Sequence, residues 1–243
     1  MLRIAGKSDV GKKRAANEDG FYLAKFSDDA AWAVVCDGMG GENGGYVASS
    51  LAVEKICKSV EEGYRDEFNE NSVKNMMLSA VSAANAQVFA KAEKTEDLKG
   101  MGTTVVLAVV RGDLIHIAYA GDSRAYLIDE NGARQITHDH SMVQLMVDRG
   151  EISQEEAQYH PDKHYITRAL GVVSQLDVDY LEEDMPEKGA LLLCSDGLSN
   201  YLDQADLHRV IWDKDPALAV GELIREANRL GGADNITAVL IAR

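Results

Sequence analysis

The stretch AWAVVCDGMGG, residues 31–41, joins an uninterrupted apolar run to an aspartate and a cluster of glycines. An apolar run of this length is typical of a strand that is covered on both faces. The strand fixes the direction of Asp37, and Gly38 lets the backbone turn so that a carbonyl oxygen can face the same ligand as the carboxylate. The stretch therefore predicts a buried strand that ends in an oxygen-rich binding site.

Three more apolar runs meet an aspartate set against glycine or a small polar residue. Asp122 lies in YAGDSR (119–124), Asp196 in LLLCSDG (191–197) and Asp234 in GGADNIT (231–237). Oxygen ligands of this kind suit hard metal ions. If the four aspartates meet in the folded chain, they form a cation site.

The remaining pattern predicts an α+β fold. Two long helices are expected after the first strand pair, from apolar positions at helical spacing around 53–60 and 73–84. Later helices are expected at 141–149 and from Asp215-Pro216 to Gly231-Gly232, and the capping-box sequence at 153–156 is expected to open another turn. The expected strands are 20–26, 31–36, a three-stranded meander at 103–110, 114–120 and 124–128, then 176–183, 190–195 and 236–242. Because the helices follow runs of strands in pairs, antiparallel sheets with outer helices are favoured over a parallel sheet.

Composition excludes several classes of partner. The chain has 25 basic and 40 acidic residues, and its net charge of -15 opposes attraction to nucleic acid or anionic lipid. A solvated surface accounts for most of this charge.

No linker divides the 243 residues, so one domain is expected, and three cysteines without a CxxC pair argue against a disulfide framework. Without a signal core or an apolar stretch of about 20 residues, a cytoplasmic protein is expected.

Seven motifs occur in an order that resembles the metal-dependent protein serine/threonine phosphatases of the type 2C (PPM) class, in their bacterial branch. The motifs are RAANEDG (14–20), VCDGMGG (35–41), GMGTT (100–104), AGDSRAY (120–126), TRALG (167–171), LCSDGL (193–198) and GGADNITAV (231–239). The resemblance implies a four-layer αββα sandwich over residues 1–243, with two antiparallel sheets flanked by helix pairs. It also implies a centre of two manganese or magnesium ions that activates a water molecule for attack on phosphate.

The resemblance assigns roles to individual residues. Asp37 matches the carboxylate that bridges both metals, Gly38 offers a backbone carbonyl, and Asp196 and Asp234 complete the ligand set. Arg14 matches the arginine that holds the phosphate, whose planar fork grips two oxygens. Without the other motifs, Arg14 would be interpreted as a surface cation. Glu18 and Asp19 match acids that bind waters on the metals.

Other assignments compete with simpler interpretations. Asp122 matches a ligand of a third metal in bacterial relatives, and the alternative is an aspartate that bonds within its own turn. Residues 138–170 resemble the variable segment beside the active site that gates or selects protein substrates, here called the flap. Its four histidines could suggest zinc, but they lack a compact ligand spacing, so a solvated flap surface is favoured. These histidines are His138, His140, His160 and His164.

The sequence departs from the class after the glycine cluster. Glu42 and Tyr46 stand where bacterial members have histidine and glutamate, and Met39 stands where eukaryotic members have a histidine assigned as general acid. The proton donor to the leaving alkoxide is therefore unassigned.

The leading hypothesis is a monomeric enzyme that hydrolyses phosphoserine and phosphothreonine on proteins and opposes a serine/threonine kinase. The alternative is a catalytically weak phosphatase-like module that binds a phosphoprotein. A narrower variant of the first is a phosphatase dedicated to a stress or sporulation partner.

Overall fold

The computed structural model describes residues 1–41 and 44–243. Glu42, one of the two departures from the class pattern, lies outside the described residues. The strands are β1 (Arg3–Asp9), β2 (Asp19–Lys25), β3 (Ala30–Met39), β4 (Gly102–Thr103), β5 (Val105–Arg111), β6 (Leu114–Ala120), β7 (Arg124–Asp129), β8 (Gly132–Gln135), β9 (Asp179–Asp184), β10 (Ala190–Cys194) and β11 (Ile236–Ala242). The helices are α1 (Gly44–Gly63), α2 (Glu70–Lys94), α3 (Met142–Asp148), α4 (Gln154–Tyr159), α5 (Asp196–Ser199), α6 (Gln204–Ile211) and α7 (Pro216–Leu230), with short 3-10 turns at Glu96–Leu98 and Pro161–His164.

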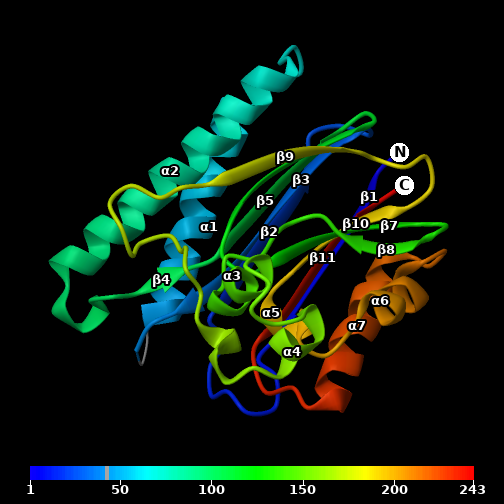
Figure 1. The fold of residues 1–243 in the computed structure, drawn as a ribbon. Coiled ribbons are helices and arrows are strands. Elements are labelled where there is room, and N and C mark those ends of the chain that lie inside the picture. The colour runs from blue at the N-terminus through cyan, green and yellow to red at the C-terminus, as the bar shows by residue number, and fades with distance from the viewer. Residues whose placement is uncertain (42–43) are drawn as a thin grey trace.

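Two antiparallel sheets form the centre of the molecule. One has the strand order β1-β11-β10-β7-β8, and the other has the order β2-β3-β5-β6-β9 with β4 paired to β3. Helices α1 and α2 cover one outer face, and α6 and α7 lie on the opposite side (Figure 1). The α+β prediction, with helix pairs outside two antiparallel sheets, is confirmed.

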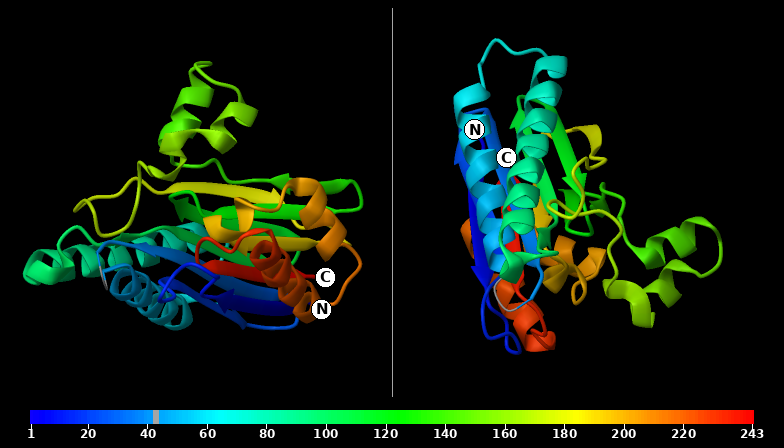
Figure 2. Two further views of the ribbon diagram at one scale, coloured as in Figure 1. Left: turned by 90° about the horizontal axis from the view of Figure 1, so that it is seen from below. Right: turned by 90° about the vertical axis from the view of Figure 1, so that its left-hand side faces the viewer.

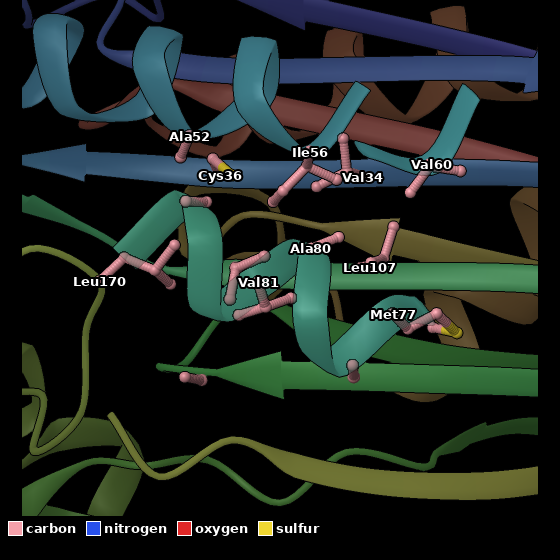
Figure 3. Packing of buried hydrophobic residues seen from close by; sticks show 14 of the residues in the cluster. Val34, Cys36, Ala52, Ile56, Val60, Met77, Ala80, Val81, Leu107 and Leu170 are labelled. Carbon is pink, nitrogen blue, oxygen red and sulfur yellow. The ribbon is translucent and has the colours of Figure 1, made fainter. Parts of the chain in front are cut away.

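Three apolar layers hold these elements together. Along β3, Trp32, Val34 and Cys36 face α1 and α2, whereas the alternate residues face the other sheet. The close-up of the outer layer shows Cys36 beside Ala52 and Val34 beside Ile56, so β3 packs against α1 (Figure 3). Because both faces of the strand are buried, its sequence reads as a continuous apolar run.

The flap, residues 138–170, projects from the sandwich. Helices α3 and α4 stand clear of the two sheets in the views from below and from the side (Figure 2). Both helices lie where the sequence predicts helical turns. Ser141 caps α3, and Ser153 and Glu156 form a full capping box at the start of α4. At the neck, Met142 N–H donates to Tyr165 O and Thr167 N–H donates to His140 O, both at 2.8 Å. The incoming and outgoing chains are therefore tied together where the flap joins the body.

The predicted three-stranded meander is wrong in one respect. Strands β5 and β6 pair in one sheet, but β7 pairs with β10 in the other. The chain changes sheets at the Gly121-Asp122-Ser123 turn, where Gly121 has φ +114 and a Cβ there would lie 2.7 Å from Thr104 Cβ. Only glycine fits such a turn, and it places Asp122 between the two sheets.

Other differences concern two elements that were not predicted and the bounds of two others. Strand β1 was not predicted, β3 continues past Asp37 to Met39, and β9 begins at Asp179 rather than near 176. Helix α6 was also not predicted. No helix of residues 1–41 and 44–243 has the length and apolar character needed to cross a membrane.

Candidate metal centre

The predicted site residues gather at one edge of the two sheets. Asp19 begins β2 and lies directly opposite Asp37 of β3 in the strand register. Asp196 follows β10, and Asp234 precedes β11, which is the neighbour of β10. Asp122 occupies the turn between β6 and β7. The charges of Asp19, Asp196, Asp122 and Asp234 all act on Asp37, so these five carboxylates share one cleft.

Two threonines hold the backbone of Asp37. Asp37 N–H donates to Thr104 Oγ1 at 2.9 Å, and Thr104 N–H returns a bond to Asp37 O at 2.9 Å. Thr103 Oγ1 also donates to Asp37 O at 2.9 Å. Thr104 Oγ1 lies 2.7 Å from Ser123 Oγ, so the same hydroxyl connects Asp37 to the residue after Asp122.

Asp19 is fixed by hydroxyl groups from the other sheet. Its Oδ2 accepts from Ser195 Oγ at 2.8 Å and from Thr237 Oγ1 at 2.6 Å. Its Oδ1 is buried and has no hydrogen-bond partner in the described part of the chain. A buried carboxylate oxygen without a donor is costly unless a cation or water satisfies it.

Arg14 meets Asp234 across the cleft. Arg14 Nη2 donates to Asp234 Oδ2 at 2.7 Å, and Asn235 N–H donates to Asp234 Oδ1 at 2.8 Å. The Asn235 side chain also clasps the loop that carries Arg14, because its Nδ2 donates to Val10 O and Ala16 O, each at 3.0 Å. Arg14 is half exposed, and its hydrogen bond to Asp234 raises the pKa of the guanidinium further. The arginine therefore stays charged at the mouth of the cleft.

Glycines bring backbone close to the carboxylates. A Cβ on Gly38 would lie 2.1 Å from Gly45 O and 2.5 Å from Glu18 O. A Cβ on Gly45 would lie 2.8 Å from the Glu18 carboxyl carbon. The start of α1 therefore packs directly on the backbone of Gly38 and beside Glu18. On the other side, Asn200 Nδ2 donates to Asp196 Oδ2 at 3.0 Å.

Burial raises the pKa of the clustered acids. For Asp37 and Asp122 the pKa lies well above its usual range, first because burial disfavours the charged form and then because neighbouring carboxylates repel it. The pKa of Asp196 is raised for the same reasons. Burial raises the pKa of Asp19 to about 7, although the hydroxyls of Thr237 and Ser195 partly offset the effect. Such a cluster requires positive charge to ionise fully.

The donor set suits a hard divalent cation in its chemistry. It consists of oxygen ligands, it is short of positive charge, and Asp19 Oδ1 lacks a partner. In residues 1–41 and 44–243, however, no three His, Cys, Asp or Glu side chains stand in an arrangement that could hold a metal ion as they are. Hydrogen bonds from Arg14 and Asn200 now occupy Asp234 and Asp196. Metal ions bound by Asp196 and Asp234 would therefore compete with these hydrogen bonds.

In metal-free protein, we expect Asp19→Asn to raise the melting temperature at about pH 8 and to raise it less at about pH 5. The folded pKa of Asp19, about 7, exceeds the unfolded value of about 3.9. Ionisation of Asp19 therefore destabilises the native state as the pH rises through this window, and asparagine escapes that loss. Thermal denaturation followed by circular dichroism in chelator measures the difference. The exposed Asp97→Asn is the control, and a difference at Asp19 that does not change with pH would contradict the expectation.

A groove of about 650 Å³ opens beside the carboxylates. Asp122 and Asp196 are among its lining residues, together with residues of the flap and of α6 such as Gln144, Tyr159 and Gln204. A smaller hollow of about 170 Å³ lies at the far ends of β10 and β11, near Gly189 and Arg243. Of these two hollows, the larger groove is the one that adjoins the acids.

The histidines of residues 138–170 do not share one environment. His138 and His164 are exposed and His160 is half-buried. His140 is 7% exposed, so the prediction of a solvated surface is wrong for it. Its ring lies against Tyr119 and bonds the Gly121 backbone, and this contact buries it at the base of the flap.

Sequence reasoning missed the residues that support the aspartates. These are Thr103, Thr104, Ser195, Asn235, Thr237 and His140. One signal was available, because Thr104, Ser195 and Thr237 are polar residues at the margins of apolar runs, and Ser195 and Thr237 also lie close in sequence to Asp196 and Asp234. The contacts of Asn235 and His140 span long stretches of chain and leave no such local signal.

Comparison with known proteins identifies the family. The profile of the protein phosphatase 2C family matches residues 6–215. The chain belongs to this family of serine/threonine phosphatases, so the family predicted from the seven motifs is confirmed.

Relatives agree in sequence and in fold. A serine/threonine phosphatase, stp, of Listeria welshimeri is 36% identical over 238 residues, which cover 98% of this chain and 94% of that protein. The crystal structure of Stp1 from Staphylococcus aureus superposes with a TM-score of 0.93 at 32% identity, covering 100% of this chain and 95% of that one. The catalytic domain of the phosphatase PstP in complex with two manganese ions has a TM-score of 0.86 at 33% identity, covering 99% and 97%.

Proposed function

We propose that this chain hydrolyses phosphoserine and phosphothreonine on proteins at the cleft that contains Asp37. The observation that carries the proposal is the convergence of buried, mutually repelling carboxylates beside a charged arginine in a chain of the protein phosphatase 2C family. The two manganese ions in the PstP complex support a dinuclear manganese or magnesium centre here. Asp37, the Gly38 carbonyl, Asp196 and Asp234 would hold the two ions.

Bound metal would supply a Lewis acid that makes water nucleophilic near neutral pH. Arg14 has the charge and the planar fork to hold two phosphoryl oxygens. For this it leaves Asp234 Oδ2, its present partner, and Asp234 is then free to turn toward Asp37. Asp19, whose Oδ1 has no partner among the described residues, and Glu18, whose carboxyl group lies near Gly45, would accept hydrogen bonds from water on the metals.

The reaction we propose is one direct displacement. Water loses a proton to solvent as it attacks phosphorus, and the bond from phosphorus to the serine or threonine oxygen breaks with its electron pair on that oxygen. Met39 has no proton to give, so the leaving alkoxide takes its proton from solvent. Tyr46 is exposed at the start of α1, and no general-acid role is assigned to it.

Asp122 is the candidate ligand of a third ion together with Asp196. Its raised pKa, caused by burial and by the charge of Asp196, supports this role. The alternative, an aspartate that serves only its own turn, predicts no change in manganese dependence when Asp122 is replaced.

We also propose that residues 1–243 act as one phosphatase domain in which the flap, 138–170, helps to select the protein substrate. The groove between the flap and α6 leads directly to Asp122 and Asp196, which supports this role. A monomeric enzyme in the cytoplasm that opposes a serine/threonine kinase is the setting that we propose, and the three free cysteines are compatible with a reducing compartment.

We expect the protein to release phosphate from p-nitrophenyl phosphate and from a phosphothreonine peptide only when manganese or magnesium is present. Chelator should abolish turnover, and manganese should raise the melting temperature because it binds the native state alone. Well-folded, manganese-stabilised protein that releases no phosphate would favour the alternative, a phosphatase-like module that binds a phosphoprotein. A preference for phosphotyrosine peptides would overturn the substrate assignment.

A further inference from the structure

His140 stands at the junction of three segments. Its backbone begins the neck of the flap, its ring stacks on Tyr119 at a centroid distance of 5.2 Å, and its side chain reaches the Gly121-Asp122 turn. Next to it, His138 N–H donates to the Tyr119 hydroxyl at 3.2 Å. The base of the flap is therefore attached to the last residues of β6 and to the turn that follows.

The contact with Gly121 is reciprocal. Gly121 N–H donates to His140 Nδ1 at 3.1 Å, and His140 N–H donates to Gly121 O at 2.9 Å. These bonds hold the peptide groups on both sides of Gly121, a residue with φ +114. The second of the two peptide groups joins Gly121 to Asp122. The direction of the Asp122 side chain therefore depends on both bonds.

The tautomer of His140 follows from these partners. Since a backbone N–H can only donate, Nδ1 must accept, and the single proton of the neutral ring is on Nε2. Nε2 then donates to Asp179 Oδ2 at 3.2 Å, while Arg168 Nη1 donates to Asp179 Oδ1 at 2.6 Å. Arg168 Nη1 also lies 3.2 Å from Nε2, so both donors share one carboxylate. Burial lowers the pKa of His140, which agrees with a neutral ring.

The same residue closes the neck of the flap. His140 O accepts from Thr167 N–H at 2.8 Å, and Ser141 and Ile166 form the next bridge. A shift of the flap relative to the sheets must therefore pass through His140 to the turn at Asp122.

We propose that His140 is a positioning residue that sets the orientation of Asp122 and makes it depend on the flap. This inference rests on the proposed function, in which Asp122 binds metal. It predicts that loss of the Nδ1 contact weakens manganese binding at Asp122, while the orientation of the other aspartates is unchanged.

Two conservative variants separate the ring nitrogens. In His140→Asn the amide oxygen can replace Nδ1 as the acceptor for Gly121 N–H, whereas in His140→Gln the amide reaches the place of Nε2. We expect His140→Asn to stay within about threefold of wild type in the manganese concentration for half-maximal activity. His140→Gln and His140→Leu should raise that concentration about tenfold or more, the usual range for residues that orient metal ligands.

Two readouts do not depend on turnover. Nitrogen chemical shifts of histidine-labelled protein should show an Nε2-protonated neutral ring for His140. Amide hydrogen exchange at Gly121 should remain slow in the magnesium-loaded wild type and His140→Asn, and should become at least about tenfold faster in His140→Gln and His140→Leu. An Nδ1-protonated ring, or equal exchange in the Asn and Gln variants, would overturn the proposal.

A double-mutant cycle then tests the route through Asp122. If His140 acts through Asp122, His140→Leu should cause no further loss of manganese affinity in an Asp122→Asn background. Additive losses would overturn the proposal, as would a lower melting temperature with unchanged manganese affinity. Failure of the proposed function is distinguishable, since wild type itself would then release no phosphate while the exchange and tautomer results would still decide the role of His140.

Discussion

Asp37→Asn should leave a folded protein whose turnover of p-nitrophenyl phosphate falls by about a thousandfold or more, equivalent to about 4 kcal/mol of activation free energy. Asp37 faces Asp19 across the β2–β3 ladder. The charges of the other four aspartates of the cleft, Asp19, Asp122, Asp196 and Asp234, also act on it. Asparagine keeps the shape of the side chain but removes the charge that two cations would share. Steady-state kinetics at saturating manganese measures the loss.

The same substitution should raise the melting temperature in chelator, because it removes one of several charges that repel one another in the metal-free cleft. Manganese should then stabilise the variant less than wild type. Asp97→Asn, at an exposed position far along the chain, should change neither quantity. Turnover of Asp37→Asn within tenfold of wild type would refute the central role of this carboxylate.

Arg14→Ala should lower kcat/KM for a phosphothreonine peptide by about a hundredfold, or about 3 kcal/mol. The guanidinium is half exposed at the mouth of the cleft, and Asp234 and Asn235 hold its loop in place. The kcat/KM of Arg14→Lys should lie between those of wild type and Arg14→Ala, since lysine keeps the charge but lacks the planar fork of the guanidinium. Inhibition by inorganic phosphate should weaken in the same order, which checks that the loss concerns phosphate binding.

Arg229→Ala is a matched control for Arg14. Arg229 forms a similar exposed pair, with Glu226 at 2.7 Å, on α7, and its loss should leave kcat/KM unchanged. Equal effects at the two positions would show that Arg14 acts only through surface charge.

Much of the fold could be predicted because several strands are buried on both faces. The runs at 31–36, 105–110 and 190–194 are continuously apolar, and the run at 236–242 is interrupted by Thr237 alone, so the pattern reports burial directly. Strand β1 escaped prediction because its sequence, RIAGKSD, is only partly buried. Its strand conformation comes from pairing with β11, at the other end of the chain.

The sheet to which β7 belongs could not be read from sequence. The glycine turn at 121 suits a tight hairpin as well as a passage from one sheet to the other, and local pattern does not distinguish these outcomes. In the folded chain, β7 pairs with β10, where Leu191 and Leu193 lie opposite residues of β7 in the antiparallel ladder. Such a choice is made by tertiary packing.

For the site, the aspartates could be predicted from the sequence, but the residues that hold them in place could not. An aspartate between an apolar run and a glycine is rare enough to stand out, whereas Thr104 or Thr237 reads as an ordinary strand residue. The ring of His140 was misjudged because its neighbours Asp139 and Ser141 are polar. Its burial arises from Tyr119 and Gly121, about twenty positions earlier in the chain.

The pairing of β1 with β11 has a practical consequence. Arg3 lies opposite Ala242, and Arg3 Nη2 donates to Arg243 O at 3.2 Å, so residues 1 and 243 are neighbours at the end of β11 remote from Asp234 (Figure 2). A short linker could join them, and the chain could be reopened at Gly150 between α3 and α4. Such a circular permutant would retain both sheets and leave each flap helix attached to the body by one side of the neck.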